Sequence, residues 1–174
     1  ARVVYASSSA VYGDSGGTRV NESMPPNPES PYAVAKLAGE HYAHVFSRLF
    51  GLTTVCLRYF NVYGPKQDAS SHYAGVIPKF ISSVGKDIPP VIFGDGEQSR
   101  DFVYGRDVVQ ANILAAENNS SGVFNIATGR SVTINELAEL IGRILGRGLN
   151  PVHRDPRLGD IRHSHADIGK AQAL

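Results

Sequence analysis

Short apolar runs alternate with longer stretches of helical periodicity along this chain. Residues 2–7 and 53–58 are short, apolar and rich in β-branched side chains, which predicts two buried strands. Between them, residues 32–50 are rich in alanine, lack proline and carry apolar side chains at helical spacing, so they predict a long helix. Ser30 suits the start of that helix as a cap, and Gly51 suits its end. A strand, a helix and a strand in this order predict a βαβ unit with a parallel sheet.

The same alternation continues through the rest of the sequence. Two segments rich in loop-forming residues, 13–31 and 61–75, predict long irregular loops. Thr133 and Glu136 have the spacing of a capping box at the start of a helix. The further elements expected are strands near 91–93, 101–104 and 123–126, helices over 77–84, 106–117 and 134–145, and a last helix near Asp167 in the polar tail 150–174. The alternation is typical of an α/β fold.

Composition and charge exclude several classes of protein. The 174 residues suit one domain, or one domain and part of another. The net charge of +1 argues against a nucleic-acid partner or a membrane surface, because neither would be bound without clustered excess basic residues. No apolar run approaches the roughly 20 residues of a membrane span. The single cysteine, Cys56, lies in an apolar run and predicts a buried thiol in a reducing compartment, so we expect a cytoplasmic protein.

Candidate chemistry gathers where the two predicted strands end. Tyr32 and Lys36 are four residues apart on the predicted helix and therefore share one face. Taken alone, this pair is also typical of a solvent-facing lysine packed along a tyrosine ring. However, the first strand ends in serines that include Ser8, and the second ends in Phe60 and Asn61. Ligands bind at the carboxyl ends of parallel strands, so we expect these side chains to meet at one edge.

The chemistry that such a group of residues suits is reversible oxidation of a secondary alcohol. A free tyrosine titrates near pH 10 and is a poor base at neutral pH. A lysine cation one turn away, together with the positive ring of a bound nicotinamide, favours the phenolate of Tyr32. A serine hydroxyl can bridge the substrate hydroxyl and that phenolate, while the nicotinamide accepts hydride from the same carbon.

In these residues the chain resembles the extended short-chain dehydrogenase/reductase superfamily, and most closely its nucleotide-sugar 4-epimerases that act on UDP-glucose or UDP-N-acetylglucosamine. The likeness rests on five motifs in order: Ser7–Gly13, Tyr32 with Lys36, Leu57–Pro65, Gly94–Val103 and Arg157–Asp160. It implies an α/β fold with the C-terminal half of a Rossmann-like doubly wound parallel sheet and a smaller substrate-binding α/β domain. Residues 1–74 would be the remnant of the NAD-binding domain. Residues 75–174 would be mainly the substrate-binding domain, with 101–126 returning to the sheet.

The resemblance also assigns the site residue by residue. It implies that the catalytic residues are Ser8, Tyr32 and Lys36, with Tyr32 as the base. It implies an NAD site that includes Ser7, Ser8, Tyr32, Lys36, Tyr59 and Phe60. It implies a UDP-sugar site made of Asn61, Gly75, Val76, Ile92, Phe93, Arg100, Arg157, Asp160 and Ser164, in which the two arginines bind the diphosphate. Considered alone, those arginines are also typical of surface ion pairs, and Phe60 of a core residue. The six histidines show no metal-binding pattern.

One feature of the superfamily is missing from this sequence. Its members begin with a strand, a Gly-rich turn and a helix that receive the dinucleotide pyrophosphate. Neither Gly16-Gly17 nor Gly94-Asp95-Gly96 joins a strand to a helix in that way. We therefore expect a chain truncated at its N-terminus, with NAD bound by the complete enzyme. The exposed sheet edge and the helix 32–50, which resembles a dimerising helix of the family, predict a homodimer.

The reaction is predicted from the two residues directly after the catalytic serine. Dehydratases of the superfamily need an acid and a base there, whereas this chain has Ser9 and Ala10. A 4-epimerase needs neither, so we expect interconversion of UDP-glucose and UDP-galactose. The alternatives are another nucleotide-sugar dehydratase or reductase, or a noncatalytic scaffold or RNA-binding relative without NAD. By resemblance, Ser164 and Gly75 occupy two walls near the sugar, and their small size predicts that N-acetylated sugars are accepted.

Overall fold

The helices and strands expected from the sequence occur in the predicted order, together with three short strands and a 3₁₀ turn that were not expected. The computed structural model describes residues 1–71, 74–148, 150–157 and 159–173. The strands are β1 (Arg2–Ser8), β2 (Thr53–Tyr59), β3 (Asn61–Tyr63), β4 (Val91–Phe93), β5 (Ser99–Tyr104), β6 (Gly122–Ile126), β7 (Ser131–Thr133) and β8 (Val152–Arg154). The helices are the 3₁₀ turn η1 (Ser9–Tyr12), α1 (Pro31–Phe50), α2 (Val76–Gly85), α3 (Gly105–Glu117), α4 (Ile134–Leu145) and α5 (Gly169–Gln172).

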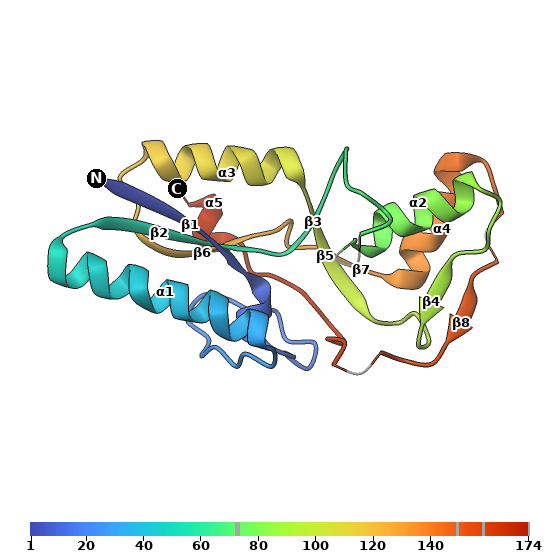
Figure 1. The fold of residues 1–174 in the computed structure, drawn as a ribbon, viewed down its shortest axis with the longest axis horizontal. Helices are drawn as coiled ribbons and strands as arrows, with labels where there is room; N and C mark the ends of the chain where they lie inside the picture. The colour runs from blue at the N-terminus through green and yellow to red at the C-terminus, as the bar shows by residue number, and fades with distance from the viewer. Residues whose placement is uncertain (72–73, 149, 158, 174) are drawn as a thin grey trace.

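A parallel sheet in the order β1-β2-β6 forms one end of the molecule. Helix α1 covers one face of this sheet and α3 the other (Figure 1). The core between the sheet and α3 contains Val55, Leu57 and Phe124, all of which are buried. The βαβ unit expected from residues 2–58 is thus confirmed as β1, α1 and β2.

The limits of α1 are set by its flanking residues. The backbone N–H of Ala33 donates to Ser30 Oγ at 3.2 Å, and Pro31 occupies the first turn. Gly51 ends the helix in the left-handed conformation with φ +66°, as expected for a C-terminal cap. Within the helix, Gly39 lies so close to β1 that a Cβ atom there would come within 2.2 Å of the Tyr5 ring. Helix α1 can therefore pack closely against β1.

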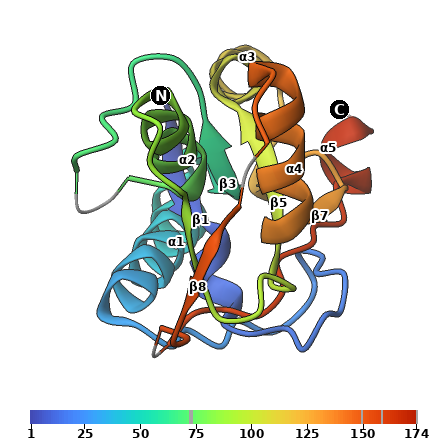
Figure 2. The same cartoon turned by 90° about the vertical axis from the view of Figure 1, so that its right-hand side faces the viewer.

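The other end of the molecule is built from α2, α4 and two small sheets (Figures 1 and 2). Strand β4 pairs in parallel with β8, while β5 lies between β3 and β7. The hydrophobic core here joins the two helices to β4 through buried Phe80, Ile92 and Leu137. The capping box expected at Thr133 and Glu136 is confirmed. None of the described helices is long and apolar enough to span a membrane.

Three short strands differ from the sequence expectation. The predicted loop 61–75 is wrong at its start, because residues 61–63 form β3 and pair in parallel with β5. Strands β7 and β8 were not expected either; β7 pairs with β5, and β8 pairs with β4. Each of these strands has three residues, which is too few to show a period along the sequence. Their strand conformation comes from pairing with a partner that is distant in sequence.

Candidate active site

Tyr32 and Lys36 lie at the carboxyl end of β1. Both project from the first turns of α1, where Tyr32 is 57% exposed. Lys36 Nζ donates a hydrogen bond of 2.9 Å to the carbonyl of Ala6 in β1. The same ammonium lies 5.7 Å from the centre of the Tyr32 ring. The pair expected from the sequence is therefore fixed to the strand that ends in Ser8, with the tyrosine open to solvent.

Ser8 is the last residue of β1 and caps the 3₁₀ turn that comes next. Its Oγ accepts a hydrogen bond of 3.2 Å from the backbone N–H of Ala10, which leaves the hydroxyl proton free to donate. Both Ser8 and Tyr32 are described, and no hydrogen bond joins them directly. A donor hydroxyl, a tyrosine and a lysine at one strand end have the chemistry needed to move a proton on and off an alcohol.

The other expected cofactor residues use their side chains inside the protein. The Ser7 hydroxyl donates to buried Glu40. The Tyr59 hydroxyl donates to Asn112 Oδ1 at 2.9 Å, so this side chain is directed toward α3. Phe60 is buried in a core cluster beside Tyr12, and the two ring centres are 6.4 Å apart. These three side chains therefore make contacts inside the protein, next to the ends of β1 and β2.

A cleft of about 630 Å³ lies between the loop after β3, the helix α2 and the strands β4 and β5. Its lining includes these residues of the expected UDP-sugar site: Asn61, Gly75, Val76, Ile92, Phe93, Arg100, Arg157 and Asp160. Ser164 lies outside this lining. Among the described lining residues, the cations are Lys79 and the two arginines, and the carboxylate is Asp160. The cleft therefore carries excess positive charge, which suits an anionic ligand.

The two arginines are held in different ways. Arg100 donates to Asp160 Oδ1 at 2.5 Å and to the carbonyl of Ser99 at 2.9 Å. The guanidinium carbon of Arg157 lies 3.9 Å from the centre of the Phe93 ring, a cation–π contact that orients the side chain against β4. Leu158, which the sequence places between Arg157 and Asp160, lies outside the described residues. Both arginines line the same cleft, and guanidinium groups are well suited to bind phosphate oxygens.

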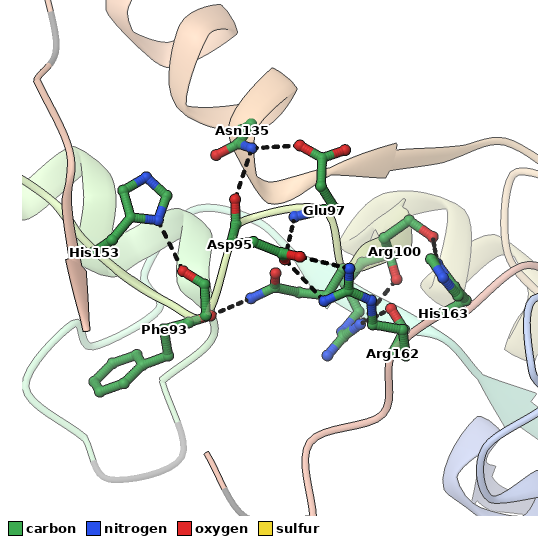
Figure 3. A network of polar contacts seen from close by, with 11 residues as sticks. Phe93, Asp95, Glu97, Arg100, Asn135, His153, Arg162 and His163 are labelled. Carbon is green, nitrogen blue, oxygen red and sulfur yellow. Dashed lines mark hydrogen bonds and ion pairs between the residues drawn. The ribbon is translucent and has the colours of Figure 1, made fainter. Parts of the chain in front are cut away.

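Arg162, two residues after Asp160, binds the turn that follows β4 (Figure 3). Arg162 donates two hydrogen bonds to the Asp95 carboxylate, at 2.8 and 2.7 Å. These hydrogen bonds lower the pKa of Asp95 to about 2. On the other side of the turn, Asn135 of α4 donates to the carbonyl of Asp95 and to Glu97 (Figure 3). Gly96 has φ +80°, and a Cβ atom there would clash with Asn135, so this turn requires glycine.

Asn61 connects the cleft to the segment that carries Ser164. Its side-chain amide donates to Ser164 Oγ at 3.2 Å and to the carbonyl of Asp101 at 3.1 Å. The carboxylate of Asp101 is fully buried and accepts hydrogen bonds from Thr128, Gly129 and the backbone of Ala166. Asp101 therefore joins β5 to two loops directly behind the cleft.

Several buried polar residues near the strand ends were not singled out from the sequence. They are Glu40, Arg58, Asp101 and Asn125. Glu40 follows Lys36 by four residues, and that spacing on a helix also fits an exposed charged face. The signal that was available is that Arg58 and Asn125 interrupt otherwise apolar strands. No group of three or more His, Cys, Asp or Glu side chains suited to a metal ion occurs among the described residues.

The parallel sheet defines a Rossmann-like α/β protein, with a tyrosine–lysine pair at the edge of the sheet and a cationic cleft that suits an anionic ligand. Residues 1–127 match the model of the NAD dependent epimerase/dehydratase family, and the chain belongs to that family.

Three similar solved structures are 4-epimerases. A UDP-N-acetylglucosamine 4-epimerase from Methanobrevibacter ruminantium, solved with UDP-N-acetylmuramic acid, is 49% identical with a TM-score of 0.95, over 98% of this chain and 55% of that one. A UDP-glucose 4-epimerase from Thermotoga maritima, solved with UDP-glucose, is 42% identical with a TM-score of 0.94, over 99% and 56%. A UDP-glucose 4-epimerase from Thermus thermophilus, solved with NAD, is 37% identical with a TM-score of 0.91, over 99% and 57%. The chain thus spans a little over half the length of each.

Proposed function

We propose that the whole protein is an NAD-dependent nucleotide-sugar 4-epimerase. It interconverts UDP-glucose with UDP-galactose, and UDP-N-acetylglucosamine with UDP-N-acetylgalactosamine. The observation that carries the proposal is the fixed Tyr32–Lys36 pair at the end of β1, where Lys36 Nζ binds the carbonyl of Ala6. The similar epimerases solved with UDP-glucose and with NAD support the choice of substrate and cofactor.

The residues of this chain have distinct roles in that reaction. Tyr32 takes the proton from the C4 hydroxyl. It returns a proton to the C4 oxygen after the 4-keto sugar has rotated to present its opposite face. Lys36 places its side-chain nitrogen 5.7 Å from the centre of the Tyr32 ring, where it stabilises the negative charge that develops during proton transfer. Ser8 relays this proton: its Oγ accepts the C4 hydroxyl proton as its own hydroxyl proton passes to Tyr32, and the same transfers run in reverse when the ketone is reduced. NAD, when bound, supplies the hydride acceptor for C4, and Lys36 and Ser8 are the donors at this edge that suit its ribose and nicotinamide.

The cleft binds the nucleotide end of the substrate. Arg100 and Arg157 line it and bind the diphosphate, while Ile92 and Phe93 of β4 form the wall beside the base. Asn61 contacts the sugar at the end nearest the catalytic residues. In this proposal residues 1–74 mainly serve the cofactor, and residues 75–174 mainly serve the substrate.

A dimer formed through α1 is a further part of the proposal. Tyr42, Phe46, Leu49 and Phe50 form a large exposed apolar face on the distal part of this helix. The Phe46 and Phe50 rings pack against each other, with centres 5.4 Å apart. Burying this face against a second copy would remove a large apolar area from water.

Turnover of nucleotide sugars by the whole protein tests the proposal. Purified protein with added NAD is incubated with UDP-galactose or UDP-N-acetylgalactosamine, and the products are identified by NMR. We expect sugars inverted at C4 with nothing else changed. A 4-keto-6-deoxy product would instead indicate a dehydratase, although neither Ser9 nor Ala10 can supply the acid and base of that reaction. No conversion of any UDP-sugar would indicate a noncatalytic relative.

A further inference from the structure

A row of buried polar side chains crosses the parallel sheet just before the carboxyl ends of its strands, where Ser8, Tyr32 and Lys36 lie. Ser7 of β1 is paired in register with Arg58 of β2, and Arg58 is paired with Asn125 of β6. Residues paired in this way on adjacent strands point to the same face of a sheet. All three are almost completely buried. The face they share is the one covered by α1, which contributes buried Glu40 to the row.

Glu40 is the centre of this row. Its carboxylate accepts two hydrogen bonds from Arg58, 2.9 Å from Nε and 2.7 Å from Nη2, and a third from the Ser7 hydroxyl. Glu40 is 6% exposed. A buried ion pair of this kind contributes little net stability compared with well-packed apolar side chains, since both charges lose their hydration. Its value to the protein therefore lies in the fixed geometry of its bidentate contact.

That geometry fixes α1 relative to β1. Tyr32, Lys36 and Glu40 recur every four residues and so lie along one stripe of the helix. Lys36 binds the carbonyl of Ala6, and one turn later Glu40 binds the side chain of Ser7. Two successive turns of α1 thus hold two successive residues of β1, directly before Ser8. A sliding or rotation of the helix would break both contacts.

The same arginine also supports the turn after Ser8. The guanidinium carbon of Arg58 lies 4.6 Å from the centre of the Tyr12 ring, and the Tyr12 hydroxyl donates to Asn125 Oδ1 at 2.7 Å. Tyr12 is the last residue of η1, the 3₁₀ turn capped by Ser8. Arg58 therefore contacts the helix that carries Tyr32 on one side, and on the other the turn that Ser8 caps.

We propose that Glu40 and Arg58 are positioning residues, which set the placement of Tyr32 and Lys36 relative to Ser8. The proposal rests on the function proposed above, since it assigns a role in that reaction. Glu40 and Arg58 do not touch the substrate; they act through α1 and η1. Their loss should lower the rate of the chemical step without weakening the binding of the nucleotide sugar in the cleft.

Steady-state kinetics of the whole protein separate positioning from stability. Glu40→Gln keeps the size of the side chain but removes the charge that pairs with Arg58. We expect kcat to fall at least tenfold while KM for UDP-galactose changes less than threefold. The double variant Glu40→Gln with Arg58→Met removes both buried charges, so it should recover thermal stability relative to Glu40→Gln while kcat stays low. If the double variant recovered kcat together with thermal stability, the proposal would be overturned. It would also be overturned if the fraction of unfolded protein fully explained the loss of kcat in Glu40→Gln.

Hydrogen exchange followed by mass spectrometry tests the same idea without turnover. In the double variant, exchange should become faster in residues 8–12 and 31–38 and stay unchanged in α4. Uniformly faster exchange, or no change, would contradict a positioning role even in a protein that proved to have no epimerase activity. Inactivity of the parent protein would count against the proposed function alone. The matched control is Asp87→Asn, which breaks the exposed ion pair with Arg147 at the far end of the molecule and should alter neither kcat nor exchange near Tyr32.

Discussion

The side-chain amide of Asn61 donates a hydrogen bond of 3.2 Å to Ser164 Oγ, although 103 residues separate the two positions. Asn61 lines the cleft, whereas Ser164 lies one contact behind it. The backbone of Ser164 is fixed as well, because its N–H donates to the carbonyl of Ser99 in β5. Because β5 holds the backbone of residue 164 in place, a larger side chain at this position would push against Asn61 and so change the shape of the cleft.

Ser164→Tyr should remove activity on N-acetylated sugars and spare UDP-galactose. The larger ring has to displace Asn61 or enter the cleft, and either change narrows the space near the sugar. A steric clash costs more free energy than the roughly 1–3 kcal/mol of a lost methylene contact. We therefore expect kcat/KM for UDP-N-acetylgalactosamine to fall at least about 100-fold. The measurement is kcat/KM for both substrates in the whole protein. The control is Ser164→Ala, which removes the hydrogen bond but adds no bulk and should keep both activities. Equal losses for both sugars in the tyrosine variant would show that residue 164 does not select for size.

Tyr32→Phe should abolish turnover while leaving substrate binding intact. Loss of a general base costs about 10²–10⁴-fold in rate, and phenylalanine keeps the ring that packs near Lys36. Turnover and the dissociation constant for UDP, measured by calorimetry, are compared with those of the parent protein. A conservative change at Tyr42, which is exposed on the same helix, serves as the control: Tyr42→Phe should turn over normally. A Tyr32→Phe enzyme with near-normal kcat would exclude this residue as the base.

Arg100→Lys should weaken binding of the nucleotide sugar with little effect on kcat. Lysine keeps the charge but cannot reproduce the planar fork of donors that Arg100 extends to Asp160 and the Ser99 carbonyl. We expect KM to rise about tenfold, equivalent to about 1.4 kcal/mol. Arg143→Lys, on the exposed surface of α4, is the matched control and should leave KM unchanged. If KM stayed constant and kcat fell instead, Arg100 would belong to the chemical step.

Local signals in the sequence were sufficient for the main helices. Ser30 and Gly51 mark the ends of α1 because a serine hydroxyl and a glycine at positive φ meet specific needs of a helix terminus. Strand β3 was missed for the opposite reason. Its three residues contain no period, and only pairing with β5 makes them a strand.

The residues of the candidate site also differ in how well the sequence alone predicts them. Tyr32 and Lys36 could be found because both lie on one helix, where spacing alone defines a shared face. The cleft residues come from segments far apart in sequence, so only the resemblance to a family predicted that they form one site. The Glu40–Arg58 pair was not foreseen, because a glutamate on a helix is usually exposed and nothing local indicates that it is buried. The side chain of Tyr59 faces α3, which its place at the end of a strand did not indicate.

Phe46→Glu should weaken self-association of the protein. Phe46 lies in the middle of the exposed apolar face of α1 and packs against Phe50. A carboxylate there would have to be buried unpaired in a dimer interface, which is unfavourable. Sedimentation velocity should show a dimer for the parent protein and a shift toward monomer for the variant. Ile144→Glu, an equally drastic change on exposed α4, is the control and should leave the dimer intact. A parent protein that sediments as a monomer at all concentrations would remove α1 as an interface.

The stability of the protein should fall in alkaline solution because of Cys56. Burial raises the pKa of this thiol to about 11, with a smaller contribution in the same direction from Glu40. The folded state thus favours the neutral thiol more strongly than the unfolded state does, in which a cysteine titrates near pH 8.5. The stability contributed by this group is fully present below about pH 8.5 and is lost as the pH rises through about 11.

Urea unfolding of the parent protein and of Cys56→Ala, measured at several values between pH 8 and 11, tests this expectation. The alanine variant should be less stable at pH 8, because a buried side chain has been shortened. Its free energy of unfolding should nevertheless decline less steeply with pH, and the two curves should converge by at most about 3 kcal/mol. Burial also raises the pKa values of Tyr5 and Tyr12, so both proteins should keep a shared decline at high pH. Parallel curves over the whole range would show that the Cys56 thiol does not titrate differently in the folded and unfolded states.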